Sequence, residues 1–299
     1  MANVHISVLT EEVINGLNIH EGDVILDGTL GGAGHSFEIA KRFPKVKIIG
    51  LDLDQDALSR SEGRLKEAKA DFVLYQSNFR DLDSALAALN IPSVDKILLD
   101  IGLSSNQFES SGRGFSFQKN EPLLMTFKAE PEEGDLTAAK IVNSWPEAEL
   151  AKVIYEYGEE RYSRQIAKAI VEARRSRPII TTLDLVSAIE SAVPKSYRHG
   201  RINPATKTFQ ALRIAVNDEL NNLKLGLIKG FEKLMTGGRL AVISFHSLED
   251  RIVKNYFKEL AKAERGLPIS KKPIVPTDEE IKNNPRSRSA KLRIIEKLI

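Results

Sequence analysis

Short apolar runs alternate with helical patterns along the first hundred residues. The apolar runs lie at 24–26, 47–51, 72–75 and 96–99, and the helical patterns at 8–17, 36–42, 56–68 and 82–89. Buried strands that alternate with helices at this spacing are typical of a parallel, doubly wound sheet. We therefore expect an α/β fold of the Rossmann-like type, whose ligands bind at the carboxyl ends of the strands.

The alternation stops after residue 106, and helical patterns alone follow. They lie at 148–157, 163–176 and 183–192, and a longer one covers 206–234. An apolar run at 239–245 and a weaker one at 294–298 predict further strands, and the Pro- and Lys-rich stretch 271–284 predicts a surface loop. We expect one α/β domain, made of 1–106 and 206–299, with a helical insertion over 107–205.

The first predicted strand ends in Asp27 and passes into the glycine-rich turn DGTLGGAG. Backbone N–H groups in such a turn face a nucleotide-like ligand. Gly31, Gly32 and Gly34 let the backbone approach that ligand closely. The second strand ends in Asp52, 21 residues after Gly31, where a carboxylate accepts hydrogen bonds from ribose hydroxyls. These residues predict a site for an adenosine-bearing cofactor.

The glycine spacing indicates which cofactor this is. Nicotinamide-binding folds favour G-x-G-x-x-G, whereas this chain has G-x-x-G-G-x-G with an acid before it. That arrangement resembles the loop of S-adenosylmethionine-dependent methyltransferases, in which an acid faces the charged amino-acid end of the cofactor. A dehydrogenase and a plain tight turn stay open as alternatives for this loop taken alone.

Composition narrows the class of protein further. The chain has 299 residues, of which 42% are hydrophobic and 28% charged, as in ordinary globular proteins. It has no cysteine, and its five histidines show no metal-ligand spacing, so we expect no metal site. No apolar run approaches the ~18 residues of a membrane span. With no signal-peptide pattern, we expect a cytoplasmic protein that does not bind membranes.

The net charge is only +2, but the charges are unevenly distributed. Residues 129–160 carry nine acids and two bases, whereas 161–213 carry eleven Lys or Arg and three acids. A basic stretch of this kind predicts a face for nucleic-acid phosphates. The alternative is a solvated helix surface.

Segments spread over the chain resemble one family, the bacterial small-subunit ribosomal RNA cytosine-N4 methyltransferases, or MraW family. The matching segments are HISV at 5–8, DGTLGGAGHS at 27–36, DIGLSSNQ at 100–107, RGFSF at 113–117, YGEER at 157–161, PATKTFQALR at 204–213, ISFHSLEDR at 243–251 and NPRSRSAKLR at 284–293. They occur in order over nearly the whole chain, and together they are highly specific.

The resemblance implies a class I methyltransferase sheet with a substrate-recognition insertion. Such a protein transfers a methyl group from S-adenosylmethionine to N4 of a cytidine in the decoding region of small-subunit rRNA. The cofactor contacts that it implies are Ala33, Gly34, His35, Asp52, Phe79, Asp100 and Gln107. One departure concerns Leu124 and Thr126, where the family usually has Asp and Arg, and it leaves the choice of substrate in question.

Transfer to an exocyclic amine needs a group that orients a poor nucleophile. A carboxylate or carbonyl that accepts an amine hydrogen pulls the nitrogen toward sp³ geometry. We expect Asp100 and the carbonyl of Ile101 to do this, with the alternative that Asp100 only binds cofactor or caps a turn. His246 follows a predicted strand and is expected to bond the base or a phosphate; the alternative is a buried structural histidine.

The expected RNA contacts are aromatic and basic residues. Phe115 and Phe117 are candidates to stack on the base, with a core role as the alternative. The basic candidates are Arg113, Arg174, Arg175, Arg177, Arg198, Arg201, Lys207, Arg286 and Arg288. The segment YGEER receives a structural role, in which Glu160 and Arg161 link its helix to a neighbour.

Three functions therefore compete. The first is the rRNA methyltransferase just described, with the small-subunit rRNA as partner. The second is an enzyme of the same fold that acts on another RNA or on DNA amines. The third is a non-catalytic RNA-binding ribosome assembly factor, against which the intact cofactor residues argue. The oligomeric state, monomer or homodimer, stays open.

Overall fold

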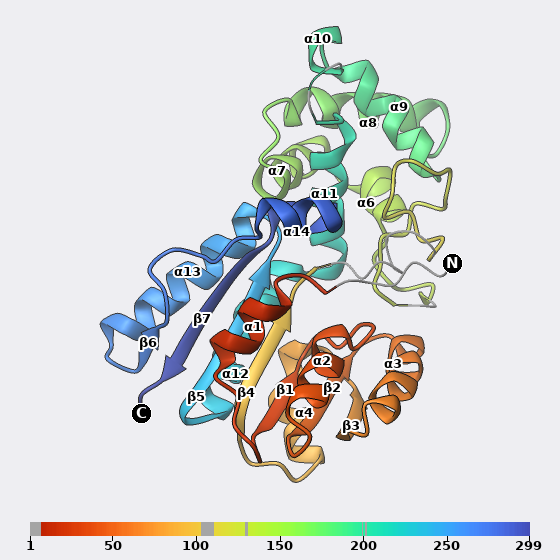
Figure 1. The fold of residues 1–299 in the computed structure, drawn as a ribbon. Helices are drawn as coiled ribbons and strands as arrows, with labels where there is room; N and C mark the ends of the chain where they lie inside the picture. The colour runs from red at the N-terminus through yellow and green to blue at the C-terminus, as the bar shows by residue number, and fades with distance from the viewer. Residues whose placement is uncertain (1–6, 103–110, 129–130, 199, 201) are drawn as a thin grey trace. The chain divides into compact units, whose positions relative to one another are not determined.

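A computed structural model describes residues 7–102, 111–128, 131–198, 200 and 202–299 (Figure 1). The chain forms two compact units. The first combines Met1–Gly102 with Leu220–Ile299, and the second is Leu103–Glu219. No helix within the described ranges is both long and apolar enough to cross a bilayer.

A seven-stranded sheet in the order β3-β2-β1-β4-β5-β7-β6 forms the first unit. The strands are β1 Val24–Asp27, β2 Lys47–Asp52, β3 Asp71–Gln76, β4 Val94–Asp100, β5 Leu234–Ser244, β6 Gly266–Pro268 and β7 Lys291–Lys297. Strands β1 to β5 are parallel, and β7 is antiparallel to β5 and β6. The Rossmann-like α/β fold is thereby confirmed; the short strand β6 was not expected.

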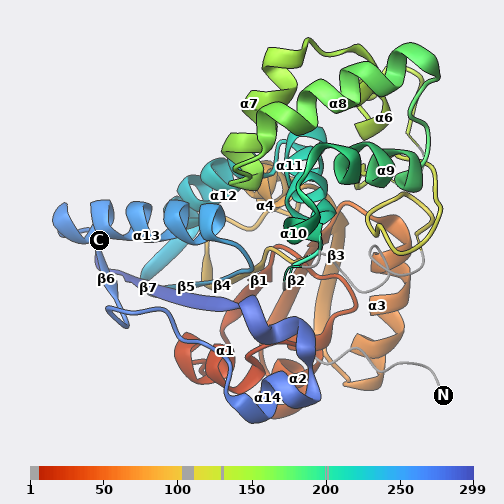
Figure 2. The ribbon, with the colours of Figure 1, turned by 90° about the horizontal axis from the view of Figure 1, so that it is seen from above.

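Helices cover both faces of this sheet. They are α1 Thr10–Leu17, α2 Gly34–Arg42, α3 Gln55–Glu67, α4 Leu82–Ala88, α12 Glu219–Lys233, α13 Ser247–Lys262 and α14 Asp278–Asn283, with 3₁₀ turns η1 Phe79–Asp81 and η2 Pro285–Ser289. Figure 2 shows α1 and α2 on one side of the sheet and α12 and α13 on the other. The expected loop over 271–284 is wrong in part, because Thr277 caps α14 by accepting a hydrogen bond from Glu280 N.

Two cores follow from the period-two alternation of the strands. Ile25 and Ile48 belong to the core on the side of α1 to α3. Their chain neighbours Leu26 and Ile49 belong to the core that includes residues of α4, α12 and α13. Because both faces are covered, the central strands are mostly apolar, which explains the continuous runs seen in the sequence.

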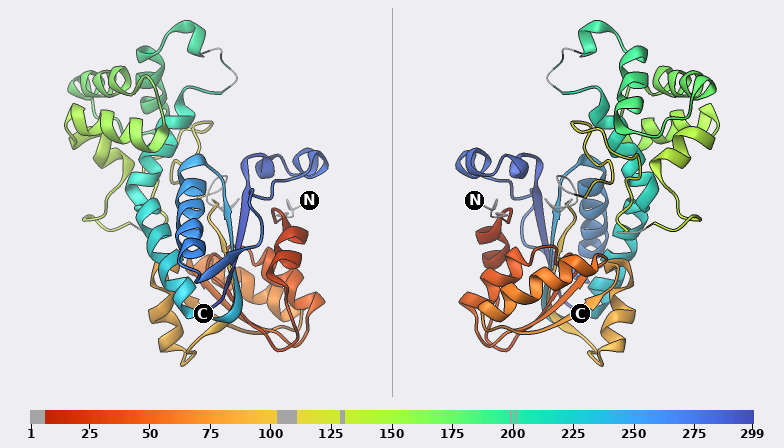
Figure 3. Two further views of the ribbon diagram at one scale, coloured as in Figure 1. Left: turned by 90° about the vertical axis from the view of Figure 1, so that its left-hand side faces the viewer. Right: turned by 90° about the vertical axis from the view of Figure 1, so that its right-hand side faces the viewer.

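The second unit is built of helices, drawn green to turquoise in Figure 3. They are α6 Ala138–Ser144, α7 Glu147–Gly158, α8 Ser163–Ser176, α9 Thr182–Ala192, α10 Lys195–Arg198 and α11 Ala205–Asn217. They share one core, to which Ile154, Ile166, Leu185 and Leu212 contribute. The irregular segment before α6 joins this core through Leu123, whose N–H donates to Ile180 O.

The single helix expected over 206–234 is wrong. Asp218 takes a left-handed conformation, φ +49°, and separates α11 from α12. Phe209 and Leu212 of α11 lie in the core of the second unit. That unit therefore extends to Glu219, whereas the sequence had placed its end at residue 205.

The contact of α7 with α11 gives a stability prediction. A Cβ on Gly158 would lie 2.5 Å from the carbonyl oxygen of Lys207, which is backbone and cannot rotate away. We expect Gly158→Ala to lower the free energy of unfolding of the second unit by about 1–3 kcal/mol, as overpacking does. Thermal and urea denaturation followed by circular dichroism would measure this.

Gly63→Ala is the matched control. A Cβ on Gly63 meets open space on α3, so the change should leave stability equal or raise it by up to about 1 kcal/mol through helix propensity. Equal melting of the Gly158 variant and the wild-type protein would contradict the close helix contact.

Candidate functional site

The glycine-rich turn connects β1 to α2 by an unusual backbone path. Gly31 has φ +51° and Ala33 φ +55°, and α2 begins at Gly34. The N–H of Gly28 donates to Leu98 O at 2.9 Å, and a Cβ on Gly28 would lie 2.5 Å from the Leu99 side chain. The turn is thus held against β4, and a larger residue at its first position would require the Leu99 side chain to shift.

Asp52, at the end of β2, closes the turn from the other side. Its Oδ2 accepts the Gly31 N–H at 2.8 Å and its Oδ1 accepts the Asp54 N–H at 2.9 Å. Burial raises the pKa of this carboxyl, against the lowering effect of these N–H donors. Each oxygen has two lone pairs, so the carboxylate retains acceptor capacity for a ligand hydroxyl.

Two residues of α3 that the sequence analysis missed also hold this turn. Ser61 Oγ donates to Gly31 O at 2.8 Å, and an Arg64 guanidinium nitrogen donates to Gly32 O at 2.7 Å. The two lie three residues apart on one helix face. That spacing was the available signal, but only the fold brings them beside the turn.

Asp27 is a buried carboxylate beneath the turn, 3% exposed. It accepts the Ser36 hydroxyl at 2.6 Å and the Thr29 N–H at 3.2 Å. Burial raises its pKa, and the negative charge of Asp100 raises it further. Because these hydrogen bonds join Asp27 to the turn and to α2, its carboxylate helps to hold the turn in place.

Asp100 lies at the end of β4 and is tied to the same turn. Its N–H donates to Thr29 Oγ1 at 2.7 Å. One carboxylate oxygen lies 3.9 Å from His35 Nδ1, and His35 Nε2 lies 2.9 Å from Val8 O. The Asp100 side chain is 22% exposed, although its Oδ1 is buried. Next to it, Ile101 N donates to Ile243 O at 3.0 Å, which fixes the end of β4 against β5.

His246 follows β5 and caps α13. Its Nδ1 accepts the Glu249 N–H at 3.4 Å, while Glu249 Oε2 accepts the N–H groups of Phe245 and His246 at 2.8 and 3.2 Å. His246 Nε2 lies 3.0 Å from the second carboxylate oxygen of Glu249, which is 1% exposed. These contacts favour the structural alternative, and Glu249 is a positioning residue that the sequence analysis missed.

Two expected cofactor residues remain, Phe79 and Gln107, and the structure describes only the first. Phe79 is half-buried, and its ring lies so close to α12 that a Cβ on Gly226 would be 2.5 Å from it. Gln107 lies outside the described residues, as does Arg201 among the expected RNA contacts.

The aromatic RNA candidates are packed inside the second unit. Phe115 is 6% exposed and stacks on Phe127 with ring centroids 5.7 Å apart. Phe117 meets the ring of Phe209 edge to face at 5.5 Å. Arg113, 7% exposed, donates to Phe127 O at 2.8 Å. These contacts favour the core role for Phe115 and Phe117, and they engage Arg113 inside the protein.

Several basic candidates are engaged within their own unit. Arg174 donates to the carbonyls of Val142 and Trp145, which end α6. Lys207 donates to a backbone carbonyl and Arg177 to a carboxylate, at 2.8 Å each. The side chains of Arg175, Arg198, Arg286 and Arg288 are exposed.

The departure at Leu124 and Thr126 also lies in the second unit. Thr126 is buried, and its Oγ1 accepts the Lys128 N–H at 3.2 Å. Leu124 O accepts the Ala138 N–H at 2.9 Å, so this segment is joined to the start of α6.

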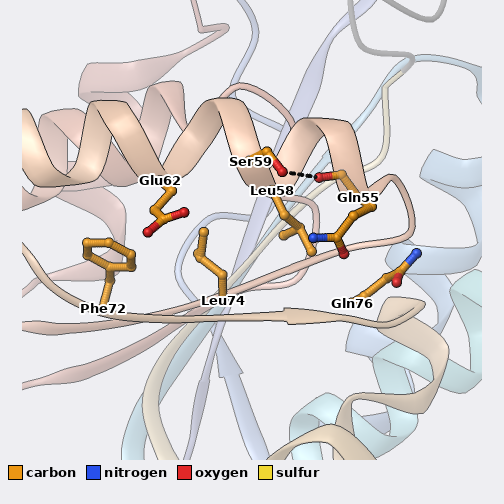
Figure 4. A pocket seen from close by; sticks show the side chains of 7 residues that line it. All are labelled: Gln55, Leu58, Ser59, Glu62, Phe72, Leu74 and Gln76. Carbon is orange, nitrogen blue, oxygen red and sulfur yellow. Dashed lines mark hydrogen bonds between the residues drawn. The ribbon is translucent and has the colours of Figure 1, made fainter.

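A hollow between α3 and β3 is separate from these residues (Figure 4). Its lining residues are Gln55, Leu58, Ser59, Glu62, Phe72, Leu74 and Gln76. The described site residues named above do not line it, so it is not the candidate site.

The chain is similar to known proteins over nearly its whole length. The model of the MraW methylase family matches residues 2–298. Proteins named ribosomal RNA small subunit methyltransferase H from Carboxydothermus hydrogenoformans and Sulfurihydrogenibium are 45% and 47% identical, and the alignments cover 98% and 97% of this chain and 98% of each relative. One from Synechococcus elongatus is 47% identical over 99% of this chain and 95% of its own.

The buried carboxylates predict a pH dependence of stability. Because the pKa of Asp52 is raised above 3.8 in the folded protein, its contribution to stability is present below that value and is lost as pH rises through the raised pKa. Asn does not ionise. We therefore expect the stability difference between wild type and Asp52→Asn, wild type minus variant, to shrink as pH rises above about 4.

Urea unfolding midpoints measured at several pH values would test this. The exposed Asp71 on β3 supplies the control, since Asp71→Asn removes the same charge from the surface. A difference between wild type and the Asp52 variant that stays constant over this range, or grows with pH, would contradict the raised pKa.

Proposed function

Since the chain belongs to the MraW methylase family, we propose that it transfers a methyl group from S-adenosylmethionine to N4 of a cytidine in the decoding region of small-subunit rRNA. The observation that carries the proposal is the family match over residues 2–298. The curated relatives, named as small-subunit rRNA methyltransferases, support rRNA as the substrate. The cytidine and its N4 atom come from the resemblance of the motifs.

The residues at the strand ends fit S-adenosylmethionine, which carries a positive sulfonium. Asp27, Asp52 and Asp100 end three adjacent strands of the sheet. They give this edge a negative charge, which suits a cation. Asp52 would accept ribose hydroxyls, and the backbone of the Gly31 turn would lie along the ligand. When bound, the cofactor supplies a methyl group that is already activated for displacement.

The protein's task is then to align and activate the acceptor amine. The lone pair of this amine is delocalised into the cytosine ring, which makes it a poor nucleophile. In our proposal the Asp100 carboxylate and the Ile101 carbonyl accept its two hydrogens and hold the nitrogen in line. The bonds from Asp100 N to Thr29 and from Ile101 N to Ile243 keep both acceptors in place.

Mapping of methylated nucleosides by mass spectrometry tests the substrate. Unmodified small ribosomal subunits would be incubated with the protein and labelled S-adenosylmethionine. We expect one methyl group on N4 of one decoding-region cytidine, since residues that suit both cofactor and amine are present. Subunits without protein and subunits that already carry the modification are the controls.

Two other outcomes have defined meanings. A methyl group on another RNA or on a DNA amine would favour the second candidate function, which the Leu124 and Thr126 departure supports. No methyl group on this rRNA, with cofactor binding intact, would likewise point to a changed substrate, whereas a protein that does not bind the cofactor would favour an assembly factor.

The role of Asp100 gives a separate prediction. Asp100→Asn replaces one acceptor oxygen by an N–H donor, so the amine loses an acceptor. We expect the single-turnover rate to fall by about 10²–10³, the effect of losing one transition-state hydrogen bond. Calorimetric titration with S-adenosylmethionine would establish the occupied fraction. Asp71→Asn should react at the wild-type rate, and full turnover by the Asp100 variant would exclude this role.

A further inference from the structure

The YGEER motif forms a cluster in the second unit that the proposed chemistry does not use. Glu160 lies in the corner between α7 and α8 and is fully buried. Its Oε1 accepts the Tyr162 N–H at 2.8 Å, and its Oε2 accepts the Tyr197 hydroxyl at 2.6 Å. One carboxylate therefore fixes a tyrosine from α10 against the start of α8.

The Tyr197 hydroxyl stays protonated, and can donate its hydrogen bond to Glu160, over the physiological pH range. Burial, together with the hydrogen bond to Glu160, raises the pKa of Tyr197 to about 12. The rings of Tyr162 and Tyr197 pack edge to face, with centroids 4.9 Å apart at 66°. Both rings are thereby held in fixed positions.

Arg161 is placed on these two rings. Its guanidinium carbon lies 4.8 Å from the Tyr162 centroid and 5.0 Å from the Tyr197 centroid, yet the residue is exposed. Among the residues that the structure describes, no carboxylate forms an ion pair with it. Because the two rings are inclined at 66°, the guanidinium can lie flat on at most one of them, and its N–H groups that point away from the rings stay available.

This arrangement differs from that of two other arginines in the unit. Arg174 and Arg177 donate to partners inside the protein, whereas the guanidinium of Arg161 lies over two aromatic rings. Further exposed cations are Arg164 on α8, three positions after Arg161, and Lys195 and Arg198 on α10, which also carries Tyr197. Lys195 lies two positions before Tyr197 and Arg198 one position after it, and Arg198 Nε donates to Val193 O at 3.3 Å.

We propose that Arg161, held on Tyr162 and Tyr197, binds a phosphate of the RNA substrate. A planar, preorganised guanidinium matches the two oxygens of a phosphodiester and loses little conformational freedom on binding. The neighbouring cations add a positive field without sequence preference. This assignment rests on the proposed function, and it differs from the purely structural role expected for Arg161.

Binding of unmodified small-subunit rRNA, measured by filter binding at several salt concentrations, tests the assignment. Arg161→Ala is expected to weaken binding about tenfold, the effect of one charge-assisted hydrogen bond. The slope of log K against log salt should become shallower by about 0.7–0.9, as for one lost phosphate contact. Arg265→Ala is the matched control, since Arg265 also stacks on an aromatic ring, Phe231, but lies in the first unit.

A second variant distinguishes the effect of the position of Arg161 from the effect of its charge. Tyr197→Phe removes the hydrogen bond to Glu160 and keeps every cation. We expect weaker binding with an unchanged salt slope, because the charge remains while its position is less fixed. If Arg161→Ala proves unstable, Arg161→Lys keeps the charge but not the planar fork, and should bind more weakly than wild type at an unchanged slope.

The outcomes are distinct. A wild-type protein that binds rRNA no better than an unrelated RNA would overturn the proposed function and this inference together. Wild-type rRNA binding that Arg161→Ala leaves unchanged in affinity and in slope would overturn the inference alone. A change in melting temperature with unaltered rRNA binding would likewise return Arg161 to a structural role.

Discussion

The parallel pairing of β1 with β2 and β4 is the constraint on which the site depends. Asp27 is in register with Gly50 on one side and Leu98 on the other. Adjacent parallel strands end at one edge, so three acids that are far apart in the sequence, Asp27, Asp52 and Asp100, end neighbouring strands. The glycine turn completes this edge, and Gly28 lets it lie close against the Leu99 side chain of β4.

The burial of carboxylates at this edge lowers the stability of the folded protein. Hydrogen-bond donors close to the carboxylates offset part of that loss. Burial raises the pKa of Asp27 and of Asp52, so their ionised forms are less favourable in the folded protein than in water. N–H and hydroxyl donors from Thr29, Gly31 and Ser36 offset part of that cost. A cationic ligand at the same edge would offset more, which is consistent with residues selected for binding at some expense in stability.

The alternation of apolar runs with helical patterns predicted the strands of the sheet and the acidic residues at their carboxyl ends. Strands with both faces buried appear as apolar runs, so most strands of the sheet were located, and with them Asp52 and Asp100. The division of 206–234 at Asp218 was not predictable, because no glycine or proline marks it; the break reflects α11 joining a different core from α12. Ser61 and Arg64 were missed because their contacts with the turn join residues about thirty positions apart.

The basic residues show most clearly where sequence reasoning ends. An arginine in a basic stretch looks the same whether it ends a helix, pairs with a carboxylate or faces solvent. Arg113 and Arg174 bond backbone carbonyls, and Arg113 does so from the core. Arg161 lies in a motif that suggested an internal link, yet it is exposed on two fixed rings. What separates these cases is the identity of the tertiary partner. A count of positive charges therefore predicts that a unit suits a polyanion, whereas only the fold tells which guanidinium groups have N–H edges left to donate.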